Sequence, residues 1–307
     1  MLISNITDTI GKTPIVKLAK LSENSYADVY VKLEFFNPLS SIKDRPAISI
    51  VDDAMANGTL AKGGTLIEAT SGNMGIALAY ICASKGINAI FTMPSSMSAE
   101  RKALLKMLGA KLVLTEPSLG MSGAIAKSQE LFEATPNAFL AKQFENPANP
   151  KAHELHTAPE ILADLPDVDI FLAGVGTGGT FSGISKVLKA HNSSVKTIAI
   201  EPFESPVISG GKASGHLIQG IGAGFIPANL DTSLIDEVMT IKGEDAITTA
   251  RKSALVEALP VGISSGANIA AALELASRKE MKGKKILTVA SSCAERYIST
   301  RLGTDIL

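Results

Sequence analysis

Short runs of β-branched residues alternate with longer runs rich in alanine and leucine along the whole chain. This alternation is typical of βα units, in which helices connect parallel strands. The predicted strands cover residues 28–33, 65–68, 89–93, 111–114, 170–173, 197–200 and 286–289. The predicted helices cover residues 44–56, 74–85, 99–108, 122–131, 153–163, 180–190, 244–255 and 267–278. Because the strand runs are nearly continuously apolar, we expect an α/β fold whose mainly parallel sheets are flanked by helices.

The pattern also indicates how the chain divides. A length of 307 residues is enough for two lobes, and the strongest interruption is the Asn- and Pro-rich segment 146–150. We expect two intertwined lobes, a larger one from residues 1–45 and 148–307 and a smaller, mobile one from residues 46–147. Ligands of such sheets bind beyond the C-terminal ends of the strands.

The composition favours a small ligand. With 29 basic and 30 acidic side chains the net charge is −1, which gives no indication of nucleic acid or of an anionic membrane. No apolar run reaches the roughly 20 residues of a membrane span, and the N-terminus lacks the features of a signal peptide. Only Cys82 and Cys293 are present, too few for a disulfide framework, so we expect a cytoplasmic protein.

Lys43 is the first candidate functional residue. It follows the predicted strand 28–33 and stands at the start of the predicted helix 44–56. The positive field of a helix N-terminus and partial shielding from water both disfavour the ammonium form and lower its pKa. Such a lysine can form a Schiff base and carry protons. The alternative is a solvated lysine paired with Asp44 or Asp53.

Two glycine-containing loops each connect a predicted strand to a predicted helix. In the segment 174–180 (GVGTGGT), adjacent backbone N–H groups and a helix N-terminus would bind a phosphate. The same segment satisfies G-x-G-x-x-G, and Glu201 ends the next strand, so a dinucleotide site is a competing interpretation. In the segment 68–75 (EATSGNMG), hydroxyl and N–H groups could bind a carboxylate, or could form an ordinary helix cap.

Three short motifs resemble catalytic signatures without meeting their requirements. Residues 262–266 read G-x-S-x-G around Ser264, but all four histidines precede the serine, which is the wrong order for an α/β-hydrolase. Residues 40–43 read S-x-x-K without the further motifs of a β-lactamase. Residues 153–156 (HELH) fall one residue short of a zinc-binding pattern, and we expect no metal site.

Seven segments, in order and over nearly the whole chain, resemble those of the cysteine synthase (O-acetylserine sulfhydrylase) family. They are residues 37–45, 70–75, 143–150, 176–180, 219–225, 262–266 and 295–297. The resemblance implies a fold-type II pyridoxal phosphate enzyme, similar to the tryptophan synthase β subunit, of the β-replacement branch. The larger lobe would then be the one that binds pyridoxal 5′-phosphate.

The resemblance assigns a role to each matching residue. The cofactor would be held by Lys43, as an internal aldimine, and by Asn73, Gly176, Thr177, Gly178, Gly179, Thr180 and Ser264. The substrate would be bound by Thr70, Ser71, Gly72, Met74 and Gln143. Lys43 would also remove the Cα proton. Ser264 would donate a hydrogen bond to the pyridine nitrogen and leave it unprotonated.

The implied reaction makes L-cysteine and acetate from O-acetyl-L-serine and sulfide through an α-aminoacrylate intermediate. Met74 and Leu217 replace a common threonine and lysine, and residues 291–295 (SSCAE) are also atypical. These changes leave open a β-cyanoalanine synthase, a serine sulfhydrylase or a cystathionine-forming enzyme. Alternatives of another class are a nicotinamide-dependent oxidoreductase and a non-catalytic binding protein. A homodimer and a serine acetyltransferase partner are implied by the resemblance alone.

Overall fold

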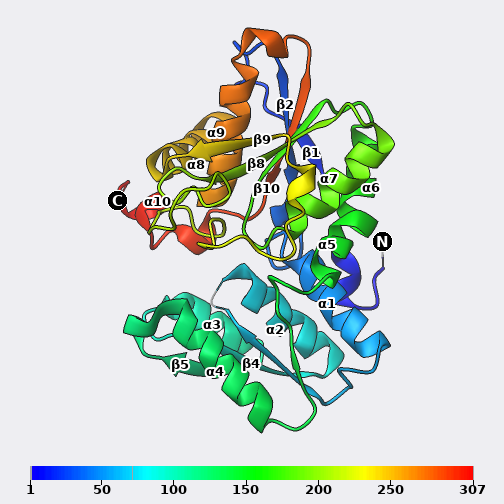
Figure 1. The fold of residues 1–307 in the computed structure, drawn as a ribbon, viewed down its shortest axis with the longest axis vertical. Helices are drawn as coiled ribbons and strands as arrows, with labels where there is room; N and C mark the ends of the chain where they lie inside the picture. The colour runs from blue at the N-terminus through cyan, green and yellow to red at the C-terminus, as the bar shows by residue number, and fades with distance from the viewer. Residues whose placement is uncertain (1, 71, 307) are drawn as a thin grey trace. The chain divides into compact units, whose positions relative to one another are not determined.

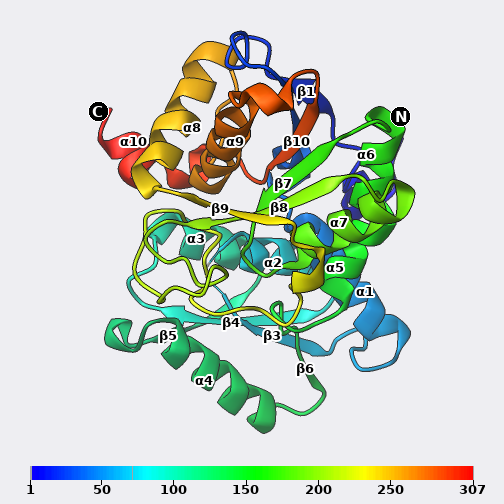
Figure 2. The same ribbon diagram turned by 45° about the horizontal axis from the view of Figure 1, so that its top comes forward.

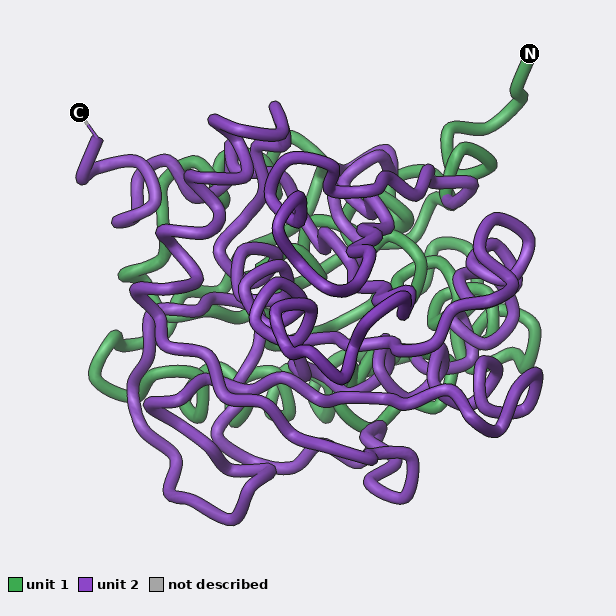
Figure 3. The backbone as a smooth tube through the Cα atoms, turned by 90° about the horizontal axis from the view of Figure 1, so that it is seen from above, with its two compact units in different colours: residues 1–10, 43–149 green, residues 11–42, 150–307 purple. Residues whose placement is uncertain are grey.

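The computed structural model describes residues 2–70 and 72–306, which form two compact units. One unit contains residues 1–10 and 43–149, and the other contains residues 11–42 and 150–307 (Figure 3). The chain therefore passes between the units at 10–11, 42–43 and 149–150, where we expected passages only at 45–46 and 147–148. Residues 1–10 belong to the smaller unit because they pack on one of its helices, where the Ser84 hydroxyl donates to the Asn5 side chain over 2.9 Å.

The larger unit is built on a six-stranded sheet with the order β1-β2-β10-β7-β8-β9. Only β1 is antiparallel to its neighbour, and the other pairs are parallel. The strands are β1 (Ile15–Lys17), β2 (Asp28–Leu33), β7 (Ile170–Gly174), β8 (Lys196–Pro202), β9 (Glu237–Ile241) and β10 (Lys285–Ala290).

Helices cover both faces of this sheet (Figures 1 and 2). Helices α8 (Gly243–Glu257) and α9 (Ile263–Ala276) lie on one face, and α6 (Ala158–Asp164) and α7 (Gly179–His191) lie on the other. Each face of the sheet has its own hydrophobic core. On β7, Leu172 packs into the core beneath α8 and α9, and its neighbour Phe171 packs into the core beneath α6 and α7. Successive side chains of a strand point to opposite faces, so burial on both sides explains the continuous apolar pattern.

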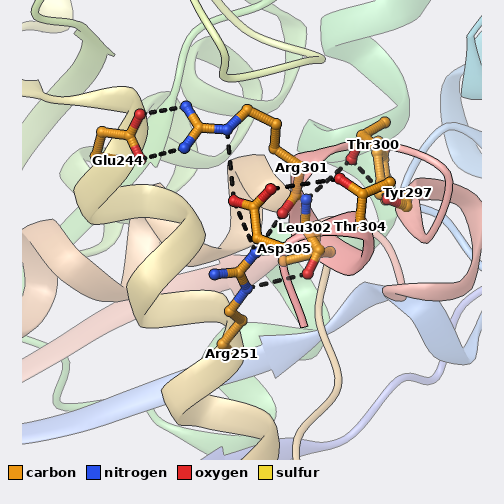
Figure 4. A network of polar contacts seen from close by, with 8 residues as sticks. All are labelled: Glu244, Arg251, Tyr297, Thr300, Arg301, Leu302, Thr304 and Asp305. Atoms are coloured by element: carbon orange, nitrogen blue, oxygen red, sulfur yellow. Dashed lines mark hydrogen bonds and ion pairs between the residues drawn. The ribbon is translucent and has the colours of Figure 1, made fainter. Parts of the chain in front are cut away.

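Polar contacts attach the C-terminal helix α10 (Arg301–Thr304) to α8 (Figure 4). The guanidinium of Arg251 donates to the backbone oxygen of Leu302 over 3.0 Å and lies 3.2 Å from the carboxylate of Asp305. Arg301 pairs with Glu244 and with Asp305. Because these groups are largely exposed, we expect the ion pairs to orient the C-terminus more than to stabilise the fold.

The smaller unit contains a fully parallel four-stranded sheet with the order β5-β4-β3-β6. Its strands are β3 (Thr65–Ala69), β4 (Asn88–Pro94), β5 (Lys111–Thr115) and β6 (Ala138–Leu140). Its helices are α1 (Asp44–Ala56), α2 (Asn73–Lys85), α3 (Ala99–Met107) and α4 (Gly120–Ala134). Helix α4 covers one face of the sheet, and α1, α2 and α3 lie on the other (Figure 2). The predicted α/β architecture with mainly parallel sheets is confirmed.

One predicted helix is more complex than expected. The segment 153–163 begins with a π-helical turn (His153–Thr157), which follows α5 (Ala148–Ala152), and continues as α6. Within the part of the chain that the structure describes, no helix combines the length and apolarity needed to cross a membrane.

Candidate active site

Lys43 immediately precedes α1, the position expected for it. Its carbonyl accepts the first helical hydrogen bond, from the Ala47 N–H at 3.1 Å. The residue before it, Ile42, donates its N–H to the Ser291 oxygen at the end of β10 over 2.9 Å. Although part of the residue is exposed, burial of the amine lowers the pKa of Lys43 to about 8. The expected direction of the shift is confirmed, with burial as its cause.

Two glycines of the 174–180 loop, Gly176 and Gly178, have no room for a side chain because backbone atoms lie too close. A Cβ on Gly176 would lie 2.4 Å from the Gly220 oxygen, and one on Gly178 would lie 2.6 Å from the Leu230 nitrogen. Gly178 also has a φ of +84°, in the left-handed region that glycine tolerates. The loop leads into the N-terminus of α7, which begins at Gly179. This close-packed backbone ending in a helix N-terminus fits a bound phosphate.

Thr180, the last residue of this loop, is positioned by a histidine that sequence reasoning missed. Its Oγ1 lies 3.2 Å from Nε2 of His153, whose Nδ1 lies 2.9 Å from Oγ1 of Thr157. His153 is fully buried in the π-helical turn, and such turns recur at functional sites. The motif HELH was set aside because it falls one residue short of a zinc-binding pattern, and the structure places His153 against Thr180.

Ser264 lies in the first turn of α9 and is 5% exposed. It faces the glycine-rich loop 219–225, since a Cβ on Gly220 would lie 3.5 Å from its Oγ. Four residues along the same helix, Asn268 accepts a hydrogen bond from the Gly174 N–H and donates to the Val289 oxygen, both over 2.8 Å. Asn268 therefore ties α9 to the start of the 174–180 loop, a role that the sequence did not reveal.

The segment after β10 connects Ser264 to the chain before Lys43. Ser292 bridges to Ser41, and its oxygen accepts the Gly262 N–H over 2.9 Å. Its hydroxyl lies 3.1 Å from the Tyr297 hydroxyl. The segment 291–295, which is atypical in sequence, thus continues from β10 and forms bridges on two sides, from Ser292 to Ser41 and from Cys293 to Val261.

The other predicted loop follows β3 in the smaller unit. Thr70 is buried, and its Oγ1 accepts the Gly72 N–H over 3.4 Å. Asn73 is the first residue of α2, and Met74 is buried behind it. Ser71 lies outside the described residues.

Gln143 is held to β3 by a buried carboxylate. Glu68 accepts the Lys142 N–H over 2.9 Å and the Gln143 N–H over 3.4 Å. Burial raises the pKa of Glu68 to about 7, against the opposing effect of these hydrogen bonds. Sequence reasoning passed over Glu68, and the only signal was a charged residue inside an apolar strand run.

Each unit, taken by itself, has groups that suit a part of pyridoxal phosphate. In the larger unit, a glycine loop at a helix N-terminus suits the phosphate, and the buried Ser264 at the start of α9 suits the ring nitrogen. In the smaller unit, the amine of Lys43, with its lowered pKa, suits the aldehyde. Hydroxyl, amide and N–H groups after β3 and β6 suit the carboxylate of an amino acid.

Comparison with known proteins decides the family. The family described as pyridoxal-phosphate dependent enzyme matches residues 6–292. A cysteine synthase of Staphylococcus aureus is 50% identical over 303 residues, covering 98% of this chain and 97% of the relative. The chain belongs to the cysteine synthase family of pyridoxal-phosphate dependent enzymes.

Solved structures of this family agree with the fold. The cysteine synthase of Entamoeba histolytica has a TM-score of 0.96 at 44% identity, covering 98% of this chain and 91% of that one. An O-ureido-L-serine synthase has a TM-score of 0.95 at 42% identity, covering 98% and 95%. The fold is therefore that of a fold-type II enzyme, and the cofactor of this cysteine synthase family member is pyridoxal 5′-phosphate.

The contacts of Glu201 agree with the family assignment. A dinucleotide site would need this carboxylate to bind a ribose, but it is bonded within the protein. Its carboxylate accepts the N–H groups of Ile208 and Ser209 over 2.7 and 3.0 Å, and the Ser209 hydroxyl over 2.5 Å. In this member of the cysteine synthase family, Glu201 thus anchors the loop after β8.

Proposed function

We propose that this enzyme forms L-cysteine and acetate from O-acetyl-L-serine and sulfide. The observation that carries the proposal is the place of Lys43 directly before α1 in a chain that is 50% identical to a cysteine synthase over 303 residues. Pyridoxal phosphate, when bound, withdraws electrons from the substrate so that its Cα proton and its β substituent can both leave.

Lys43 would bond to the cofactor and would then remove the Cα proton of the substrate. Burial lowers the pKa of this amine to about 8, so its unprotonated form is more available near neutral pH than that of an exposed lysine. Burial of the amine thus supports the assignment of proton transfer to this residue.

The remaining site residues would bind and orient. The N–H groups and threonine hydroxyls of residues 176–180 would hold the phosphate. Ser264 would donate to the ring nitrogen, and Asn73 would donate to the phenolic oxygen. Residues 70–72, Met74 and Gln143 would bind the amino-acid carboxylate, for which Met74 offers only its backbone N–H. Mobility of the smaller lobe, made mainly of residues 46–147, would admit the substrate.

A related β-replacement enzyme could use another nucleophile or another donor substrate than the ones proposed. Met74 is 3% exposed, so its thioether fills a space next to the carboxylate-binding loop where a hydroxyl would add a donor. A cyanide-, serine- or homocysteine-using variant of the same β-replacement is therefore the second candidate. A homodimer, a serine acetyltransferase partner and a cytoplasmic location complete the proposal by resemblance to the family.

Steady-state assays test the proposal directly. The purified enzyme is supplied with O-acetylserine, O-phosphoserine, serine or cysteine as donor, and with sulfide, cyanide or homocysteine as nucleophile. We expect the highest kcat/KM for O-acetylserine with sulfide, and loss of turnover in Lys43→Ala. A higher kcat/KM for cysteine with cyanide would instead identify a β-cyanoalanine synthase.

A further inference from the structure

Glu68 connects the two segments that would bind the substrate's carboxylate. It lies near the C-terminal end of β3, two residues before Thr70, and is 5% exposed. Its two carboxylate oxygens accept the backbone N–H groups of Lys142 and Gln143, and the Gln143 side chain also hydrogen-bonds to it. A buried carboxylate is costly unless hydrogen bonds compensate it, so these donors account for its presence in an apolar strand.

The backbone around Gln143 is held in an uncommon conformation. Lys142 has a φ of +49°, in the left-handed region that residues other than glycine rarely adopt. Its N–H is the one that Glu68 accepts over 2.9 Å. On the other side of this residue pair, the side-chain amide of Asn149 donates to the backbone oxygen of Gln143 over 2.8 Å. Such outliers persist where surrounding contacts over-determine the backbone, and they concentrate at binding sites.

We propose that Glu68 is a positioning residue, which fixes the backbone and the side-chain amide of Gln143 for recognition of the substrate's α-carboxylate. This inference rests on the carboxylate-binding role of Gln143 proposed above. Above its pKa of about 7 Glu68 is ionised and offers only acceptors, so at pH 8 the amide must turn its NH2 group toward it. That NH2 group has two hydrogens, and the second can be donated to a substrate carboxylate.

The test measures binding of L-cysteine and of cysteamine, which lacks the carboxylate, by the change in visible absorption of the cofactor-loaded enzyme. In Glu68→Gln we expect the Kd for cysteine to rise about tenfold, as for loss of a hydrogen bond to a charged group, with little change for cysteamine. The matched control is Glu145→Gln, an exposed carboxylate of the same loop, for which neither Kd should change.

A double-mutant cycle with Gln143→Ala completes the test. If Glu68 acts through Gln143, Glu68→Gln should add little to the loss already present in Gln143→Ala. Additive losses, equal weakening of cysteine and cysteamine, or an unchanged Kd for cysteine would each overturn the proposal. Glu68→Asp, with a carboxylate one methylene shorter, should show the same selective loss and decides the matter if Glu68→Gln does not fold.

The Kd for cysteine does not depend on which donor substrate the enzyme turns over, so it tests the role of Glu68 separately from the proposed activity. Failure to use O-acetylserine would overturn the proposed function while a selective loss of cysteine affinity still supported the role of Glu68. Conversely, normal turnover together with an unchanged Kd in Glu68→Gln would overturn only the role of Glu68.

Discussion

At the scale of single residues, burial sets the chemistry of two ionisable groups in opposite directions. It lowers the pKa of Lys43 to about 8 and raises that of Glu68 to about 7, because removal from water disfavours the charged form of each group. The lysine shift was predictable from its place between a strand and a helix. The glutamate shift was not, since a sequence does not say which end of a strand is covered.

The shift of Glu68 predicts a pH-dependent stability. The folded state holds this proton more tightly than the unfolded chain, so the contribution of Glu68 to the free energy of unfolding falls as the pH rises from 4.5 to about 7. The side chain of Glu68→Gln does not titrate. The free energy of unfolding of this variant minus that of wild type should therefore increase between pH 4.5 and pH 8. The expected gain is at most about 3 kcal/mol.

Urea unfolding of wild type and Glu68→Gln at pH 4.5 and pH 8 checks this prediction, with Glu116→Gln, an exposed carboxylate of the same unit, as the control. A relative stability of Glu68→Gln that stays constant, or declines toward pH 8, would show that the carboxylate is already ionised well below neutral pH.

Met74 gives a prediction about specificity. Met74→Thr restores a hydroxyl beside Asn73, at the N-terminus of α2, and should raise the ratio of kcat/KM for sulfide to that for cyanide by several-fold. Parallel assays with the two nucleophiles measure this ratio, and Met74→Leu, which keeps an apolar side chain of similar volume, is the control. Equal ratios in all three proteins would make Met74 a packing residue.

At the scale of helices and strands, the elements that sequence reasoning found are those with a strong apolar pattern. Residues 28–33 and 44–56 were predicted with the bounds that β2 and α1 have. Strands β1, β6 and β9 were missed because β1 and β6 have only three residues each and β9 has an exposed face. The π-helical turn of His153 was also missed, since its bounds depend on packing against α7 and Thr180.

That packing depends on Gly183, and this gives a prediction for the element. A Cβ on Gly183 would lie 2.3 Å from the Pro150 oxygen and 2.8 Å from Cβ of His153. Gly183→Ala should therefore push the π-helical turn away from α7 and cost about 1–3 kcal/mol, as overpacking does. Gly215→Ala, where nothing lies within 4 Å, is the matched control.

Thermal unfolding and titration with pyridoxal phosphate measure the two consequences of Gly183→Ala. We expect a lower Tm and weaker cofactor binding, because His153 would no longer orient Thr180. A Tm and an affinity equal to those of Gly215→Ala would show that the turn can shift at no cost.

At the scale of the whole molecule, the sequence predicted two intertwined lobes, and the roles that the resemblance assigns to the site residues stay predictions. It did not predict where the chain crosses between them, because the N-terminal ten residues pack on α2 through contacts such as Ser84–Asn5 that have no signature. Nor did it reveal the residues that support the site, such as Asn268, Glu68 and His153. Their contacts join segments distant in sequence, which only the folded chain brings together.

Lys43 is the residue that we propose carries the cofactor. Borohydride reduction of the loaded protein, followed by proteolysis and mass spectrometry, tests this proposal most directly, with Lys142 as an internal comparison. We expect one reduced pyridoxal phosphate on the peptide that contains Lys43, and none in Lys43→Ala. Attachment to another lysine, or a protein that stays unmodified while saturated with cofactor, would contradict the account.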